Sequence, residues 1–113
     1  MLKMKRNKNA SPFGYYFQYL DKVDKGVKDS KEFGSMLILS LVEEIGEMSR
    51  AYLAKHGRKQ TNLAAQGDEP YEQELGDILL CILRLARIKK INLHEALMHS
   101  LKKIEKRRTQ PKI

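Results

Sequence analysis

Apolar side chains recur along this chain at the spacing of helices. In residues 13–25, for example, the aromatic and apolar residues Tyr16, Tyr19, Leu20 and Val23 follow one another at spacings of three, one and three, and they share one side of a helix. No segment alternates apolar and polar residues with the period of two that is typical of strands. The pattern predicts an all-α fold of four helices arranged like a four-helix bundle, and we expect oligomerisation to complete it.

Local signals indicate where these helices begin and end. Ser11, followed by proline, predicts the start of the first helix, and Gly26 predicts its end. Ser30 is a candidate cap for the second helix, which we expect to continue to about residue 56. Asn92 and Glu95 form a capping box at the start of the last helix.

The segments outside the helices divide the chain simply. Residues 1–11 are predicted to form a flexible basic arm, residues 12–108 a single helical domain and residues 109–113 a tail. Residues 58–69 are polar and without periodicity, which predicts a loop between the second helix and a third helix over residues 70–90.

Composition and charge limit the classes of function. The formal net charge is +8, but the first ten residues carry four basic side chains and residues 102–113 carry six against one acid, so the middle of the chain is nearly neutral. Nucleic acid is therefore not the expected partner. No apolar run is long enough to cross a bilayer, and we expect no secretion signal. The single cysteine, Cys81, fits a reducing compartment, so we expect a cytoplasmic protein.

Two helices carry acids where apolar side chains are expected. In the second helix, Glu44 and Glu47 lie beside an apolar stripe made of Leu37, Leu41, Ile45 and Met48, whereas Glu43 points to the far side. In the third helix, Glu74 and Asp77 lie on or beside the face that carries Ile78, Cys81 and Leu85. Each helix thus places two carboxylates, three residues apart, near the surface that should pack inward.

Buried carboxylates need compensation, because an ionised acid in an apolar setting is costly. Arg84 is the best internal candidate for neutralising them, and a divalent cation is the other solution. Ligands that are all oxygen favour magnesium, manganese or calcium over zinc. A single run of acids is more often a solvated helix face, but two such pairs on two apolar faces favour a metal site.

These motifs resemble a known family. The segments LVEEIGEM at 41–48 and ELGDIL at 74–79 are similar to the signature of the MazG-like all-α nucleoside triphosphate pyrophosphohydrolases, and the resemblance extends over residues 33–108. It implies a hydrolase that converts a nucleoside triphosphate and water into the monophosphate and pyrophosphate, for which nucleotide-pool clean-up is the expected role. Ser40 departs from a lysine that many relatives carry there, which leaves a phosphate contact from that position open.

The resemblance also implies roles for individual residues. Glu44, Glu47, Glu74 and Asp77 would be ligands of Mg2+, for which Mn2+ can substitute. Glu43 would be an accessory catalytic acid that helps to orient the attacking water. Relatives form dimers or tetramers, so a homo-oligomer is expected.

Two basic residues extend this interpretation. Lys103 and Arg107 lie four residues apart on the last helix and are candidate contacts for the phosphates of the substrate. A solvated, basic helix end explains them equally well.

Other functions stay open at this stage. A phosphoribosyl-ATP pyrophosphatase is a related enzyme, but Leu41 and Val42 stand where its helices usually carry lysine and glycine. An alternative from another class is a basic helical module that binds nucleic acid or protein, with acids that are only structural. Salt-sensitive binding that requires the basic ends would favour that alternative.

Overall fold

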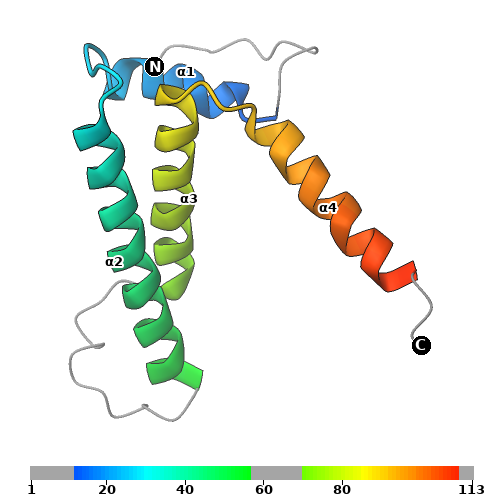
Figure 1. Ribbon diagram of the computed structural model, residues 1–113. Helices are drawn as coiled ribbons and strands as arrows, with labels where there is room; N and C mark the ends of the chain where they lie inside the picture. The colour runs from blue at the N-terminus through cyan, green and yellow to red at the C-terminus, as the bar shows by residue number, and fades with distance from the viewer. Residues whose placement is uncertain (1–11, 57–69, 110–113) are drawn as a thin grey trace.

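Four helices and no strands make up the part of the chain that the computed structural model describes, which is residues 12–56 and 70–109. The helices are α1 (Gly14–Val23), α2 (Lys31–His56), α3 (Tyr71–Ile88) and α4 (Leu93–Thr109) (Figure 1). The predicted all-α class and all four predicted helices are confirmed. The predicted basic arm at 1–11, including its Ser11 cap, the loop at 58–69 and nearly all of the tail lie outside the described residues.

Two of the predicted helix caps are present as hydrogen bonds. The Ser30 hydroxyl oxygen accepts from the amide of Phe33 at 3.0 Å, and the Asn92 side-chain oxygen accepts from the amide of Glu95 at 3.1 Å. Each bond satisfies one of the amides that the first turn of a helix leaves without a partner. Gly26 has a φ of +81°, a left-handed conformation that glycine adopts without strain, and it follows the end of α1 as predicted.

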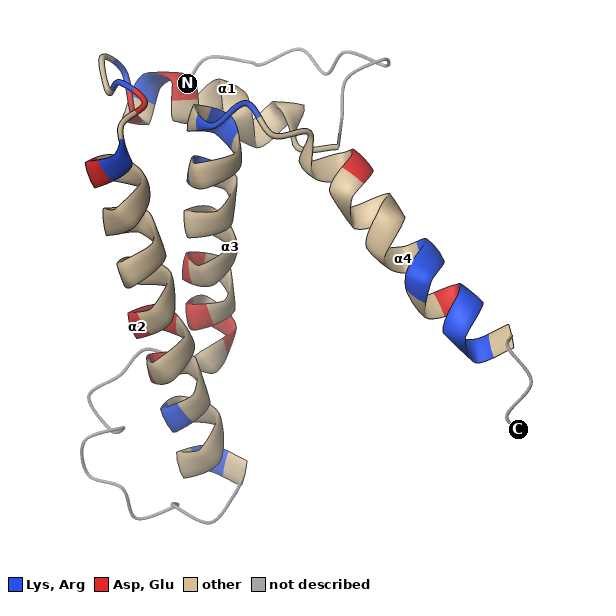
Figure 2. Cartoon of the chain, viewed as in Figure 1, with Lys and Arg blue, Asp and Glu red and all other residues tan. Residues whose placement is uncertain are grey.

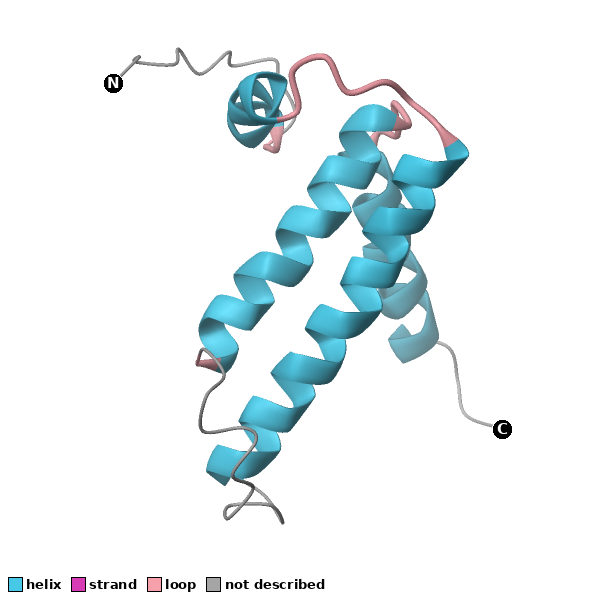
Figure 3. Ribbon diagram, turned by 90° about the vertical axis from the view of Figure 1, so that its left-hand side faces the viewer, coloured by secondary structure: helices cyan, strands magenta, loops and turns pink. Residues whose placement is uncertain are grey.

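Helices α2 and α3 form an antiparallel hairpin, and α1 lies across one end of it (Figures 1 and 3). The core is thin: among the described residues, the buried apolar side chains are Leu20, Leu37, Leu83 and Ala86. Leu37 was predicted to face inward and does so. Ile45, predicted to belong to the same stripe, is 43% exposed, because the two helices of the hairpin bury only a narrow strip of one another.

Ion pairs attach α1 and the segment after it to the end of α3. The pairs are Arg84 with Asp24, Arg87 with Asp21 and Lys89 with Asp29. Asp24 is buried, and Arg84 donates two hydrogen bonds to it, from Nε at 3.0 Å and from Nη2 at 2.9 Å. A bidentate pair of this kind fixes direction as well as distance, so it holds the end of α1 in place against α3.

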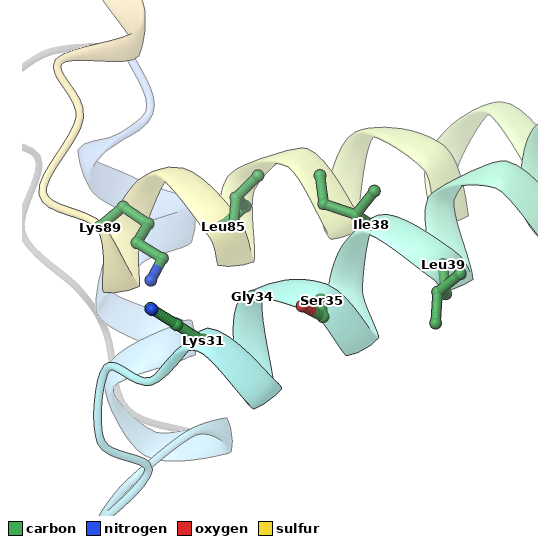
Figure 4. Close-up of a pocket in the computed structure, with 7 residues that line it drawn as sticks. All are labelled: Lys31, Gly34, Ser35, Ile38, Leu39, Leu85 and Lys89. Atoms are coloured by element: carbon green, nitrogen blue, oxygen red, sulfur yellow. The ribbon is translucent and has the colours of Figure 1, made fainter.

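An open cavity of about 600 Å³ lies between the first turns of α2 and the last turns of α3. Figure 4 shows the ammonium groups of Lys31 and Lys89 near each other at one end of it. Gly34 leaves room for Lys89, because a Cβ atom there would stand 3.2 Å from Lys89 Cε. No acidic residue lines this cavity, so the predicted metal centre must lie elsewhere on the hairpin.

Helix α4 projects away from the hairpin (Figure 1). All of its residues after Leu93 are exposed, including the apolar stripe Leu97, Leu101 and Ile104. The four helices therefore do not close into a bundle within one chain, and completion by a second copy stays a prediction. Among the helices described, none combines the length and apolar character needed to cross a membrane.

Candidate metal centre

Three carboxylates from two helices converge on one point inside the hairpin. Glu44 comes from the middle of α2, and Glu74 and Asp77 come from the first two turns of α3. One oxygen from each of them lies within 4.8 Å of the other two. Figure 2 shows the acidic stretches of α2 and α3 level with one another. We call Glu44, Glu74 and Asp77 the acid cluster. The antiparallel hairpin creates it, because it brings the middle of α2 alongside the start of α3.

The burial of the acid cluster is what makes it chemically unusual. Glu74 is only 3% exposed, and Oε2 of Glu44 is buried with no hydrogen-bond partner among the described residues. A carboxylate oxygen in that position costs free energy unless a cation or a donor reaches it. Three carboxylate oxygens that lie close together are ligands that Mg2+ and Mn2+ prefer, and the residues present therefore fit a divalent ion.

Arg84 does not neutralise this charge. The sequence made it the best internal partner for the acids, because it lies near Asp77 on the helix surface. In the structure its guanidinium group turns toward α1 and binds Asp24. The prediction for Arg84 was wrong. Its partner, Asp24, lies 60 residues earlier at the end of α1, and the spacing of residues within α3 gives no information about that contact.

The other two predicted acids lie outside the acid cluster. Glu47 is half-buried one turn after Glu44 on α2, and its carboxylate is not among the three that converge. Glu43 is exposed, as its predicted direction requires. The structure thus brings together three of the four predicted ligands, and leaves Glu47 adjacent to them.

The predicted phosphate contacts are not beside the acids in a single chain. Lys103 and Arg107 are exposed on α4, whose basic second half lies well away from the acidic stretches of the hairpin (Figure 2). If these residues contact a substrate bound at the acid cluster, they must do so from another copy of the chain or after a movement of α4.

Two neighbours of the acid cluster were not singled out from the sequence as parts of a site. Gln73 donates a hydrogen bond from Nε2 to Oδ1 of Asp77 at 3.3 Å. Its position four residues before Asp77 on the same helix is the signal that could have identified it. Cys81 is half-buried next to the acids, and its pKa is raised by burial and by the carboxylates of Glu44 and Asp77.

The two glycines beside the acids do not mark a close approach of helices. A Cβ atom at Gly46 would meet nothing within 4 Å, and one at Gly76 would meet only the side-chain nitrogen of Gln73, at 3.8 Å. Both glycines are exposed, so among the described residues neither stands where two helices touch.

Comparison with known proteins places the chain in a family. The family model described as MazG nucleotide pyrophosphohydrolase domain matches residues 34–111. That span contains the acid cluster, all of α3 and all of α2 except its first three residues, and the chain belongs to this family. Membership indicates a nucleotide substrate, pyrophosphohydrolase activity and the use of a divalent metal, for which the acid cluster offers a site.

One relative is similar over most of its length. The uncharacterized protein YpjD of Bacillus subtilis (strain 168) is 33% identical over 78 residues, which is 66% of this chain and 69% of that protein. No solved structure matches the chain. The resemblance seen in the EExxE and ExxD motifs is therefore confirmed at the level of the family.

Proposed function

We propose that this protein is a magnesium-dependent pyrophosphohydrolase that converts a ribo- or deoxyribonucleoside triphosphate and water into the monophosphate and pyrophosphate. The single observation that carries the proposal is the convergence of one carboxylate oxygen each from Glu44, Glu74 and Asp77 within 4.8 Å of one another. Membership of the MazG family supports the same reaction class. Nucleotide-pool clean-up in the cytoplasm is the role we propose for it.

The acid cluster would hold the magnesium ion, and manganese is expected to replace it. Glu47 is proposed as a further ligand, because it is half-buried one helical turn from Glu44. When bound, the ion would neutralise charge on the phosphate oxygens and make a nearby water molecule more acidic. Phosphoryl transfer depends chiefly on such positioning and charge neutralisation.

Side chains around the acid cluster are proposed to orient its carboxylates and the attacking water. Gln73 fixes the orientation of the Asp77 carboxylate through its hydrogen bond to Oδ1. The hairpin limits access of bulk water to Glu74, which is nearly inaccessible. Glu43 is exposed outside the acid cluster, and its proposed part in orienting the attacking water requires the substrate to extend over the face of α2 that carries it.

Lys103 and Arg107 are proposed to bind the phosphate tail from a second copy of the chain. The exposed apolar stripe of α4, formed by Leu97, Leu101 and Ile104, supports this arrangement, because none of the described residues buries it. We propose that a homodimer or homotetramer covers the stripe and places these two cations beside the acids of a neighbouring copy.

A nucleotide panel tests the proposal. The wild-type protein is incubated with each common nucleoside triphosphate and magnesium, and pyrophosphate and orthophosphate are measured separately. We expect pyrophosphate and the monophosphate from one or more nucleotides, no reaction in chelator, and loss of activity in the double variant Glu44→Gln, Asp77→Asn. Glu32→Gln, an exposed acid at the start of α2, is the matched control and should retain full activity. Activity that survives the double variant would refute the assignment of the metal ligands.

A further inference from the structure

A second cavity, of about 340 Å³, lies between α1 and α3. Two aromatic residues line it, Phe13 just before α1 and Tyr16 within α1, and α3 contributes Leu79, Leu80 and Leu83. Its volume is at the lower end of the range for small-molecule sites, which are typically apolar with a few placed polar groups. A planar ring system is the kind of ligand that two aromatic side chains and a leucine wall accommodate.

The polar part of this cavity connects it to the acid cluster. Gln73, Gly76 and Asp77 complete its lining, and Asp77 is also one of the three converging carboxylates. A ligand that fills the cavity therefore ends beside the acids. The larger cavity, beside Lys31 and Lys89, is lined by none of the three acids.

Gln73 gives the cavity a group that can distinguish one ring edge from another. Its amide uses one N–H for the bond to Asp77, which at 3.3 Å is long, and keeps a second N–H and a carbonyl oxygen for a ligand. An adjacent donor and acceptor are what a side-chain amide presents to the edge of a nucleobase. Tyr16 is 53% exposed, and its ring meets that of Tyr15 edge to face, with the centroids 5.7 Å apart.

We propose that this cavity receives the base of the nucleoside triphosphate, with Tyr16 stacking on the ring and Gln73 reading its edge while the phosphates extend past Asp77 to the acid cluster. The inference rests on the proposed function and adds to it the part of the substrate that the acids do not contact. It makes α1, which lies outside the family match at 34–111, a determinant of specificity.

Gly76 offers a test that separates this role from folding. An added Cβ atom meets no protein atom closer than 3.8 Å, so alanine is tolerated there, and it takes space from the cavity that Gly76 lines. Replacing glycine by alanine inside a helix stabilises it, and we expect Gly76→Ala to raise the Tm by roughly 4–8 °C. Gly46→Ala, on α2 and away from the cavity, is the matched control with the same expected gain in stability.

The experiment measures binding of two ligands by calorimetry in magnesium. One is a nucleotide analogue with a methylene group between the α- and β-phosphates, and the other is inorganic triphosphate, which has no base. We expect Tyr16→Leu to weaken binding of the nucleotide by roughly 5- to 100-fold, since stacking on one aromatic ring contributes in that range. Gly76→Ala should also weaken binding of the nucleotide, because the added methyl group takes space from the cavity. Neither variant should weaken binding of inorganic triphosphate by more than about twofold. Gly46→Ala should change neither affinity.

Three outcomes would overturn the inference. If wild-type protein binds the nucleotide no more tightly than inorganic triphosphate, or if both cavity variants keep the affinity of the wild type for the nucleotide, the base does not occupy this cavity, while the proposed function stands. If neither ligand binds in magnesium and no nucleotide is hydrolysed, the proposed function fails together with the inference.

Discussion

Replacing Glu44 by glutamine should make the metal-free protein more stable. In the acid cluster, one oxygen of Glu44 lies within 4.8 Å of oxygens of Glu74 and Asp77. At an effective dielectric constant of about 20, two unit charges about 5 Å apart repel each other by roughly 3 kcal/mol. Glutamine keeps the shape of Glu44, removes its charge, and supplies an amide N–H that can point at a neighbouring carboxylate of the acid cluster, where Glu44 offers only acceptor oxygens.

Solvent reaches part of the site, because Glu44 and Asp77 are only half-buried, so most of that repulsion is screened. We therefore expect a gain of about 1–2 kcal/mol, which corresponds to a rise in Tm of roughly 5–10 °C for a domain of this size. Magnesium should reverse the order. Saturating ion stabilises the wild type by about 2.7 kcal/mol at one hundred times its Kd, whereas the variant should gain little.

The assay is thermal unfolding followed by circular dichroism, in chelator and in magnesium, with Glu43→Gln as the control. Glu43 is exposed on the same helix and outside the acid cluster, so its substitution should change stability by less than about 0.5 kcal/mol and preserve the response to magnesium. Two results would show that the three carboxylates do not repel one another in a shared metal site. One is a Tm of Glu44→Gln below that of the wild type in chelator, and the other is a rise in Tm with magnesium as large as that of the wild type.

Further predictions concern the rest of the chain. Asp24→Asn should lower the free energy of unfolding by about 2–3 kcal/mol in chemical unfolding. Asparagine keeps one acceptor oxygen for Arg84 but removes the charge that pairs with it, and the Arg84 side chain is only 27% exposed. Lys103→Ala and Arg107→Ala should each raise KM with little change in kcat; unchanged KM for both would remove them from the substrate site. Cys81 should react with iodoacetamide more slowly at pH 8 than in the unfolded chain, because its raised pKa keeps the thiol protonated; equal rates would contradict this.

The helices and most of the acid cluster could be predicted because both depend on local spacing. Glu74 and Asp77 are three residues apart, which puts them on one side of α3 whatever the rest of the chain does. The capping residues Ser30 and Asn92 likewise accept hydrogen bonds from amides only three residues later in the chain. Periodicity of this kind also identified Leu37 as a core residue, and it is buried.

The features that depend on how helices dock could not be predicted. Arg84 has its partner on a segment 60 residues earlier, and only the crossing of α1 over α3 brings them together. The cavity beside Asp77 also exists only because α1 places Tyr16 against α3. The exposure of Ile45 has the same origin, since the apolar stripe on α2 is wider than the strip that α3 covers.

Direct measurement of bound manganese tests the central claim. Free Mn2+ is followed by electron paramagnetic resonance while wild-type protein is titrated into it, and the Glu44→Gln, Asp77→Asn double variant is titrated in parallel. We predict that the wild type removes manganese from solution and that magnesium displaces it, whereas the double variant, folded by circular dichroism, leaves manganese free. Equal binding by the two proteins would contradict the assignment of a divalent cation to Glu44, Glu74 and Asp77.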